Sequence, residues 1–410
     1  MLRTNARLCL GLMWALGAAC QSSGGKGGIS NDGAIDQSSS GGVAGTGGTA
    51  AMGGATGTGG TTGAGGATGK GGAAATGGVT GTGGRTGTGG VTGTGGRTGT
   101  GGAIGTGGAT APTGFWDTGT IPAAKNVMMF VFLNRTNGNY ADSEVYWSFK
   151  SGSISETHSI AAQSSYDMPA NSSGRMYFYL CAAGDATCAS DPTKSKYYDF
   201  IEHTIGATQY NGNTTRVDAF GIKIAMRLHC ADGFDDAVGE DYATFQEDRA
   251  VTFQRFIDAV PDEFKPLAQA PHAPYRIVEP GAGGFNSGGP NATYYDSFVN
   301  ALWAANGLTV TKPGPNGSGL GSYPDLSAAI FRHVGDVAGT FDASGKLLDK
   351  TLWKNSATFY KTAPADYYAM FWHANALGGR AYGFPYDDVG SYSSYMSHSN
   401  PQTMLVAIGW

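Results

Sequence analysis

The sequence predicts a mainly β protein with an inserted mixed α/β region, preceded by a long segment that cannot form a core. Short runs of β-branched and aromatic residues alternate with polar residues and are separated by Asn, Gly and Ser turns. A central block instead repeats its apolar residues at helical spacing. The chain has 69 glycines among 410 residues, and most of the excess lies between Cys20 and Pro112.

Residues 1–20 have the layout of an export signal. Arg3 and Arg7 precede an apolar run over 8–16, and small residues then lead to Cys20. Small residues before a cysteine resemble the bacterial lipoprotein processing box, in which that cysteine is lipidated. Gly17 stands where the box usually has Leu, so ordinary secretion remains an alternative. The expected location is secreted or on the cell surface, as a lipoprotein of the bacterial outer membrane.

Residues 21–112 form a Gly/Thr/Ala-rich segment. Between about 76 and 110 the pattern Thr-Gly-Thr-Gly-Gly recurs with one variable residue, giving a period of six. Such a composition predicts a flexible coil with a root-mean-square reach on the order of 50 Å. We interpret it as a tether between an anchor and a folded part that spans 114–410.

The charge and the cysteines limit the partners of the folded part. The net charge is −5 and the folded part has no cluster of Lys or Arg, so nucleic acid is excluded as a partner. The histidines lack the close pairing of a helical metal site, and no metal is expected. Cys181 and Cys188 flank a short loop that a disulfide can close, with zinc as the weaker alternative. The expected oligomeric state is a monomer.

Strand patterns open the folded part. The run 127–133 is apolar throughout, and 145–149 and 176–180 have apolar residues at every second position. Short strands of this kind, separated by turns, favour a sandwich or a barrel. Helical spacing follows over 242–260 and 294–305, and strand character returns after 358. We therefore expect a β domain built from about 120–234 and 356–410, an α/β lobe over about 235–355, and a binding cleft between them.

Two carboxylates could share one site. Residues 198–205 and 215–222 are predicted strands joined by a loop over 206–214, with Glu202 beside Phe200 and Asp218 beside Arg216. Glycoside cleavage needs one protonated and one ionised carboxyl group, so Glu202 is the candidate acid and Asp218 the candidate base. Taken alone, a strand carboxylate is more often an exposed or salt-bridged surface residue.

The stretches 199–205, 215–222 and 381–389 resemble glycoside hydrolase family 64, the laminaripentaose-producing β-1,3-glucanases. The resemblance covers most of 120–410 and includes both carboxylates. It implies a thaumatin-like β domain joined to an α/β domain across a wide cleft. It also implies inverting cleavage inside β-1,3-glucan chains, release of short laminari-oligosaccharides, and no cofactor.

The resemblance and the sequence around the motifs suggest further contacts with the substrate. The candidates are Thr204, Thr215, Tyr386, Asp387 and Asp388. After Pro385, the last three of these could equally cap a turn. The loop after Thr204 departs from the family, since this chain has Gly206, Tyr210 and Asn211 where an Asn and a Trp are expected, so the product length is open.

Two other interpretations remain. A non-catalytic, glucan-binding or adhesive surface lipoprotein could keep the same scaffold, although a binding module has no need of two carboxylates in opposed environments. Hydrolysis of another wall polysaccharide is also compatible, because a fold does not fix its substrate. Both Glu202 and Asp218 are present, which favours an enzyme acting on β-1,3-glucan.

Overall fold

The computed structural model describes residues 79–80, 82–83, 111–314, 320 and 323–410. The chain divides into two units, 1–95 and 96–410. In the first, β1 (Val79–Thr80) and β2 (Thr82–Gly83) form a short parallel pair. The predicted export signal, Cys20 and most of the tether lie outside the described residues. All that follows concerns the second unit.

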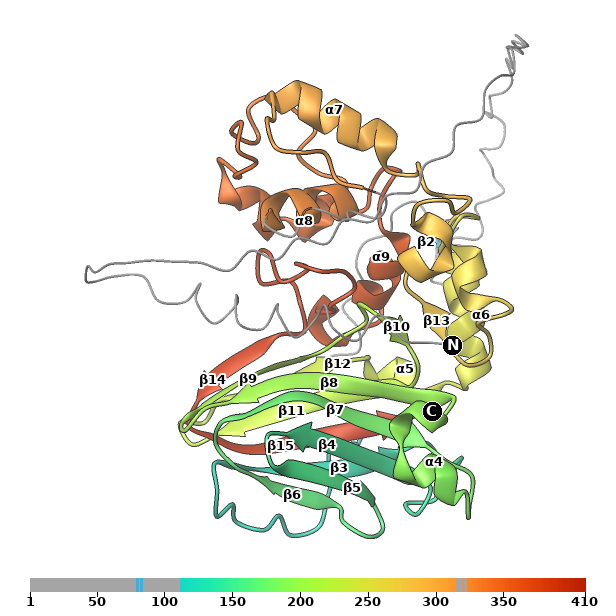
Figure 1. The fold of residues 1–410 in the computed structure, drawn as a ribbon, viewed down its shortest axis with the longest axis vertical. Helices are drawn as coiled ribbons and strands as arrows, with labels where there is room; N and C mark the ends of the chain where they lie inside the picture. Colours follow the sequence, from blue (N-terminus) through green and yellow to red (C-terminus); the bar gives the residue numbers. More distant parts are fainter. Residues whose placement is uncertain (1–78, 81, 84–110, 315–319, 321–322) are drawn as a thin grey trace, which may run out of the picture. The chain divides into compact units, whose positions relative to one another are not determined.

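The strands of the second unit form two sheets (Figure 1). The six-stranded sheet has the order β14-β9-β8-β7-β4-β5, and the five-stranded sheet has the order β12-β11-β15-β3-β6. All neighbouring pairs are antiparallel except β15 with β3. The strands of the first sheet are β4 (Val145–Ser151), β5 (Ile154–Ser159), β7 (Ser172–Leu180), β8 (Tyr197–Ile205), β9 (Gln209–Thr214) and β14 (Met396–Ser399). Those of the second are β3 (Met128–Arg135), β6 (Ser165–Met168), β11 (Lys223–Cys230), β12 (Asp235–Gly239) and β15 (Pro401–Gly409).

The inward faces of the two sheets share one apolar core. Phe130 and Phe132 of β3 meet Trp147 and Phe149 of β4, and Trp147 is fully buried. Because side chains alternate along a strand, this core takes every second residue of each strand. The three strand runs predicted from the sequence are confirmed, and the two stacked sheets form a sandwich.

The other face of the five-stranded sheet is covered by a smaller apolar cluster. Phe115 packs edge-on against Trp116, Tyr242 and Phe245, and the Trp116 indole N–H donates to the Tyr242 hydroxyl at 3.0 Å. The five-stranded sheet is therefore apolar on both faces. The outer face of the six-stranded sheet carries polar residues instead, and the candidate site lies there.

The longer α-helices gather apart from the sheets (Figure 1), whereas α4 (Ala186–Ser190) follows β7 and α5 (Tyr242–Gln246) packs Tyr242 and Phe245 on the five-stranded sheet. The longer helices are α6 (Arg249–Ala259), α7 (Asp296–Asn306), α8 (Pro324–Arg332) and α9 (Tyr367–Ala374). A second core, with Phe256, Leu302 and Trp372 among its members, holds the longer helices together. Helix α5 begins at a side-chain cap, because Asp241 accepts from the Thr244 backbone N–H at 2.7 Å. Helices over 242–260 and 294–305 are thus confirmed, with a break between α5 and α6.

Two secondary-structure predictions outside the Asp218 segment were wrong. Residues 209–214 form β9 and pair with β8, whereas a loop was expected over 206–214. After residue 358 the strands do not return at once, because Tyr367–Ala374 is a helix whose first turn is capped by Asp366. Only β14 and β15 rejoin the sheets, and residues 359–384 contribute to the helical core.

One disulfide links two of the three cysteines in the described part of the chain. Cys181 and Cys188 form a disulfide, and Cys230 is a buried free thiol. Within the described ranges, no three His, Cys, Asp or Glu side chains group as a metal site. No helix of the described part is long and apolar enough to cross a bilayer.

Candidate active site

Glu202 lies on the outer face of β8. Ile201, His203 and Ile205 are fully buried toward the sandwich core, so the alternation turns Glu202 to the other side. Its side chain is 20% exposed. In the strand register it stands between Arg175 on β7 and Asn213 on β9, both on the same outer face. A rigid strand with partners on both sides thus fixes the position of the carboxylate.

Asp218 lies in an irregular segment, not on the strand predicted over 215–222. Residues 215–218 have no regular structure, and only β10 (Ala219–Phe220) follows, paired with β13 (Ile277–Val278). The backbone N–H of Arg216 donates to the carbonyl of Tyr382 at 2.7 Å, so a distant segment takes the bond that a strand neighbour would have made. The Asp218 side chain is 47% exposed.

One guanidinium joins the two carboxylates. Arg175 Nε donates to Glu202 Oε1 at 3.0 Å, and its Nη1 donates to Asp218 Oδ2 at 2.9 Å. The guanidinium carbon also lies 3.9 Å from the centre of the Phe200 ring. The expectation that Glu202 and Asp218 lie near each other is met in this geometry, but Arg175 rather than Arg216 is the cation beside Asp218.

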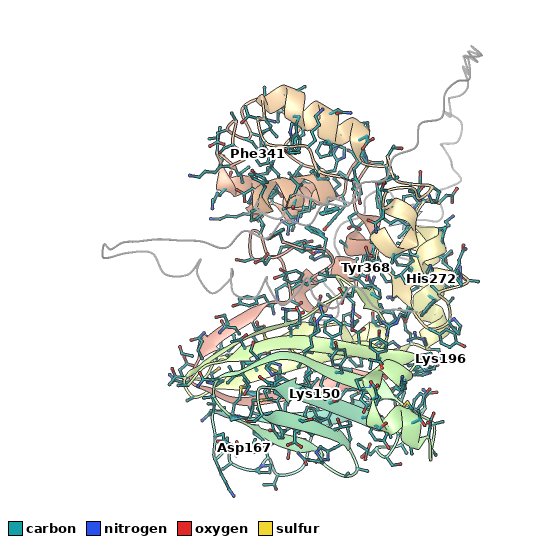
Figure 2. All side chains as sticks on the ribbon, in the orientation of Figure 1. Lys150, Asp167, Lys196, His272, Phe341 and Tyr368 are labelled. Atoms are coloured by element: carbon teal, nitrogen blue, oxygen red, sulfur yellow. A yellow bond between two sulfur atoms is a disulfide. The ribbon has the colours of Figure 1, made fainter. Side chains whose placement is uncertain are left out.

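Arg216 points away from Asp218 and into the protein. Its guanidinium donates to both oxygens of Glu240 at 2.7 Å and to Asp199 Oδ2 at 2.7 Å. All three side chains are at most 5% exposed. Burial opposes the charge of Arg216, but the two carboxylates hold its pKa above the usual value. The phenol of Tyr368 on α9 donates to the Arg216 carbonyl at 2.6 Å (Figure 2).

The segment 381–389 approaches the same place. Tyr382 is buried, and its hydroxyl donates to Asp388 Oδ1 at 3.4 Å. Burial raises the pKa of Tyr382, and the charges of Asp388, Asp387 and Glu202 raise it further. Burial also raises the pKa of the half-buried Asp388 carboxyl. Tyr382 and Asp388 therefore add an uncharged phenol and a weakly acidic carboxyl to the surroundings of Glu202.

Asp387 was predicted to contact the substrate, and the structure places it in the interior instead. It is fully buried and accepts from Arg332 Nη2 at 3.0 Å, from His373 Nε2 at 2.9 Å and from the Gly383 N–H at 2.8 Å. Burial opposes ionisation, but His373 and Arg332 hold the pKa of Asp387 below its usual value. These bonds hold the 383–389 turn in place, and a sugar contact by Asp387 stays a prediction.

The other residues predicted to contact the substrate differ in their exposure and in their neighbours. Thr204 is on the outer face of β8, and its hydroxyl lies 3.0 Å from that of Ser173. Thr215 is 4% exposed, and its hydroxyl accepts from the Val217 N–H at 3.2 Å, which closes the turn before Asp218. Tyr386 is half-buried with a left-handed backbone, φ 71°. Sugar contacts by these residues, and by Asp388, stay predictions.

Two neighbours of Glu202 were missed from the sequence. Arg175 is two positions from Tyr177 on β7, so the alternation of the strand could have placed both side chains on the outer face. Which residue of β8 lies beside Arg175 depends on the β7–β8 register, which the sequence of β7 alone does not give. Asn213 was assigned to a loop. It is 8% exposed, and its Oδ1 has no hydrogen-bond partner among the described residues. A buried, unpaired carbonyl beside a carboxylate indicates a ligand contact.

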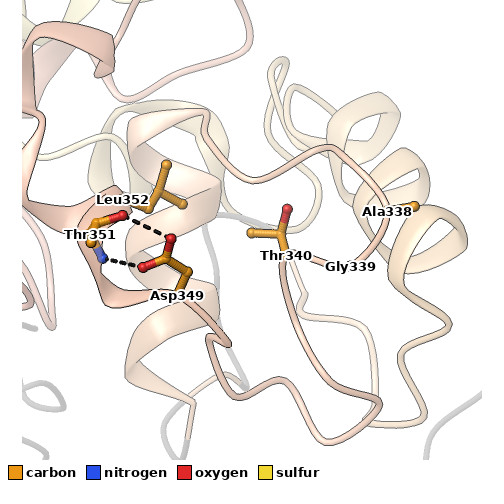
Figure 3. Close-up of a pocket in the computed structure, with 6 residues that line it drawn as sticks. All are labelled: Ala338, Gly339, Thr340, Asp349, Thr351 and Leu352. Carbon is orange, nitrogen blue, oxygen red and sulfur yellow. Dashed lines mark hydrogen bonds between the residues drawn. The ribbon is translucent and has the colours of Figure 1, made fainter.

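A small pocket lies elsewhere, among residues 338–352 (Figure 3). Asp349 on its rim is occupied, since it accepts from the backbone N–H and the hydroxyl of Thr351 at 2.9 Å each. The residues that line this pocket include no pair of carboxylates and none of the predicted site residues. The cleft expected between the β and α/β regions stays a prediction.

The chain is similar to curated and structurally characterised β-1,3-glucanases. Glucan endo-1,3-β-glucosidases of an Arthrobacter species and of Cellulosimicrobium cellulans are 25% and 24% identical to the chain, over 53% of it and 46% of each relative. The chain thus spans about half the length of these relatives. A crystal structure of a family 64 laminaripentaose-producing β-1,3-glucanase from Paenibacillus barengoltzii is 28% identical, with a TM-score of 0.55, over 71% of this chain and 77% of that one.

Two further findings concern the same fold. The Paenibacillus enzyme has also been solved in complex with laminarihexaose. A family 64 β-1,3-glucanase domain from Clostridium beijerinckii shares the fold, with a TM-score of 0.57 and 23% identity over 71% of this chain and all of that one. The family model described as β-1,3-glucanase matches residues 117–321 and 322–408, which is most of the second unit. The chain therefore belongs to glycoside hydrolase family 64, the β-1,3-glucanases.

Proposed function

We propose that the chain hydrolyses internal linkages of β-1,3-glucan, with Glu202 as general acid and Asp218 as general base. The observation that carries the proposal is the bridge by Arg175, which bonds one carboxylate at 3.0 Å and the other at 2.9 Å. Two carboxylates on one guanidinium lie within a few ångströms of each other. Both carboxyl groups therefore face one site, as the two-carboxylate mechanism of glycosidases requires.

The reaction follows from the two roles. Glu202 gives its proton to the bridging oxygen as the bond from that oxygen to C1 breaks, and Asp218 takes a proton from the water that attacks C1. The attack comes from the opposite face, so the new hydroxyl has inverted configuration. Asp218, with 47% of its side chain exposed, has the easier access to water, whereas Glu202 is held on a strand.

The substrate is proposed from the family and from the relatives. The curated relatives are named for endo-1,3-β-glucosidase activity, and the Paenibacillus enzyme for production of laminaripentaose. We expect short laminari-oligosaccharides as products. Thr204, Tyr386 and Asp388 are the proposed sugar contacts, because they lie on the outer sheet face or on the segment that approaches it.

The full chain incubated with soluble and insoluble substrates tests this function. We expect oligosaccharides from laminarin and curdlan, and none from β-1,4- or β-1,6-linked glucans. Chromatography of the products would show short oligosaccharides before glucose if the cleavage is internal. Binding to curdlan without any release of reducing ends would instead identify a glucan-binding module, and release from another polysaccharide alone would identify a different hydrolase.

Location and assembly are separate parts of the proposal. Residues 1–20 are proposed to direct export, Cys20 to carry a lipid, and residues 21–112 to tether the catalytic part 114–410 as a monomer. Growth of an expressing bacterium with labelled palmitate tests the anchor. Label on the wild type but not on Cys20→Ser supports it, and an unlabelled protein in the medium supports ordinary secretion.

A further inference from the structure

We propose that Arg175 is the positioning residue of the carboxylate pair, which selects the oxygen of Glu202 that carries the proton and orients Asp218 toward Glu202. The inference rests on the proposed hydrolysis and adds a residue to it. Its basis is that one side chain donates to both carboxylates while stacking on Phe200. A planar guanidinium with donors in a fixed fork is suited to such a bridge.

The strand register explains how Arg175 reaches both partners. Arg175 on β7 is directly paired with Glu202 on β8, so their side chains leave the same face of the sheet side by side. The Phe200 ring lies 3.9 Å from the guanidinium carbon and supports it from below. The guanidinium is therefore held in one orientation, with Nε directed at Glu202 and Nη1 directed at Asp218.

Asp218 depends on Arg175 more than Glu202 does. Its segment has no regular structure. The nearest arginine in sequence, Arg216, donates its hydrogen bonds to Asp199 and Glu240 instead. The bond from Arg175 at 2.9 Å is thus the ionic link that orients Asp218 toward Glu202. Without it, a side chain that is half exposed can adopt other rotamers in water.

The bridge also selects the oxygen of Glu202 that carries the proton. Arg175 donates to Oε1, and an oxygen that accepts from a cation is disfavoured as a site for a proton. The proton of the general acid is therefore on Oε2, away from Arg175, where it can reach a glycosidic oxygen.

Other titratable groups face the pair. They are Tyr177 on β7, which interacts with Arg175 and Asp218, and Tyr382 and Asp388 of the 381–389 segment, where Tyr382 interacts with Glu202. Burial raises the pKa of both phenols, so they stay neutral near pH 7. Burial also raises the pKa of Asp388. Arg175 is the cation that bonds both Glu202 and Asp218.

The test compares Arg175→Met and Arg175→Lys with the wild type. The matched control is Arg227→Met, which removes a surface arginine paired with Asp235 on the other sheet. For each full-length protein, kcat and KM on laminarin are measured from pH 4 to pH 9. A melting curve for each variant verifies that it is folded.

For Arg175→Met we expect kcat to fall about 10- to 100-fold with little change in KM. The pH profile of kcat should also differ from that of the wild type, because the variant loses the cation that bonds both carboxylates. Arg175→Lys should keep a profile near that of the wild type but a low kcat, since an ammonium cannot bridge the pair in the same way. Arg227→Met should behave as the wild type.

The outcomes separate this inference from the proposed function. If wild type cleaves laminarin, Glu202→Gln does not, and Arg175→Met retains the wild-type kcat and pH profile, Arg175 has no positioning role and the inference is overturned. If Glu202→Gln retains activity, the assignment of the acid fails first. If Arg175→Met does not fold, the Lys variant decides: a wild-type kcat in that variant would overturn the bridge.

Discussion

Asp199 and Arg216 form a buried ion pair of 2.7 Å that connects the two halves of the candidate site. Asp199 is on β8, the strand that carries Glu202, and Arg216 is in the irregular segment that carries Asp218. Asp199 also accepts from the Gly221 N–H at 2.8 Å, on the far side of Asp218. The ion pair therefore sets how the Asp218 segment lies against β8.

Replacement of Asp199 by Asn tests this connection. The variant keeps the shape of the side chain but loses its charge, so Arg216 retains Glu240 alone in the interior. We expect a loss of about 1–3 kcal/mol in the free energy of unfolding and at least a tenfold fall in kcat. Urea unfolding and laminarin hydrolysis measure the two effects. Asp235→Asn, in an exposed ion pair, is the matched control and should cost less than about 1 kcal/mol. An unchanged kcat in Asp199→Asn would contradict the connection.

Asp387 and its neighbour Asp388 should differ in their effects. Asp387→Asn leaves the fully buried Arg332 without its carboxylate, so we expect a loss of about 3–5 kcal/mol in stability. Asp388→Asn affects a half-buried carboxyl that accepts from the Tyr382 phenol at 3.4 Å and has no ion pair among the described residues, so stability should change by less than about 1 kcal/mol. If Asp388 contacts the sugar, this second variant should still raise KM. Equal melting temperatures for the two variants would show that the assigned roles are wrong.

His203 should make the fold sensitive to acid. It is fully buried among aromatic rings, neither ring nitrogen has a partner in the described part of the chain, and burial lowers its pKa to about 3. The unfolded chain binds a proton below about pH 6.5 and the folded chain does not. Stability is therefore lost as the pH falls from about 6.5 to about 3, by about 1.4 kcal/mol per unit for this group.

Replacement of His203 by Leu should remove that loss. Relative to wild type, the variant should gain about 2–3 kcal/mol in unfolding free energy between pH 7.5 and pH 4.5. Urea titrations at the two pH values provide the measurement. His272→Leu, at a half-buried position, serves as control. A constant difference between His203→Leu and wild type at both pH values would refute a neutral, buried histidine.

Asn213 should matter more for turnover than for folding. Its Oδ1 is buried without a partner, directly beside Glu202 in the strand register. Asn213→Val removes that unsatisfied group and adds a residue that strands favour, so the melting temperature should be equal or higher. If a sugar hydroxyl or the attacking water donates to Oδ1, kcat/KM on laminarin should fall at least tenfold. Unchanged kcat/KM would show that Asn213 contacts neither.

The sandwich strands could be predicted because burial imposes a period of two on them. Residues 145–149 show it clearly, since their inward side chains form the core. Residues 127–133 are apolar throughout instead, because their sheet is covered on both faces. In β9 the alternation of apolar and polar residues is not visible in the sequence. Asn211 and Asn213 lie on the outer face of the sheet and Gly212 lies on the core face, so the stretch was interpreted as a loop. Gly212 is needed there because a Cβ would collide with Tyr210 and with the Glu202 backbone.

The site was only partly predictable for the same physical reason. Glu202 followed from the alternation in β8, but the environment of Asp218 depends on contacts between residues far apart in sequence. Arg216 and Phe220 are both buried and lie an even number of positions apart, which is the pattern of one face of a strand. Arg216 is nevertheless in an irregular segment. The choice of Arg175 over Arg216 as the partner of Asp218 depends on the β7–β8 register, which neither segment reveals alone.

The most direct test of the account is laminarin hydrolysis by wild type, Glu202→Gln and Asp218→Asn, each verified as folded by its melting curve. Glu156→Gln, a surface carboxylate on β5, is the matched control. The account predicts release of oligosaccharides by wild type and control, with kcat at least 10³-fold lower in the two site variants. Hydrolysis near the wild-type rate by either folded site variant would contradict it.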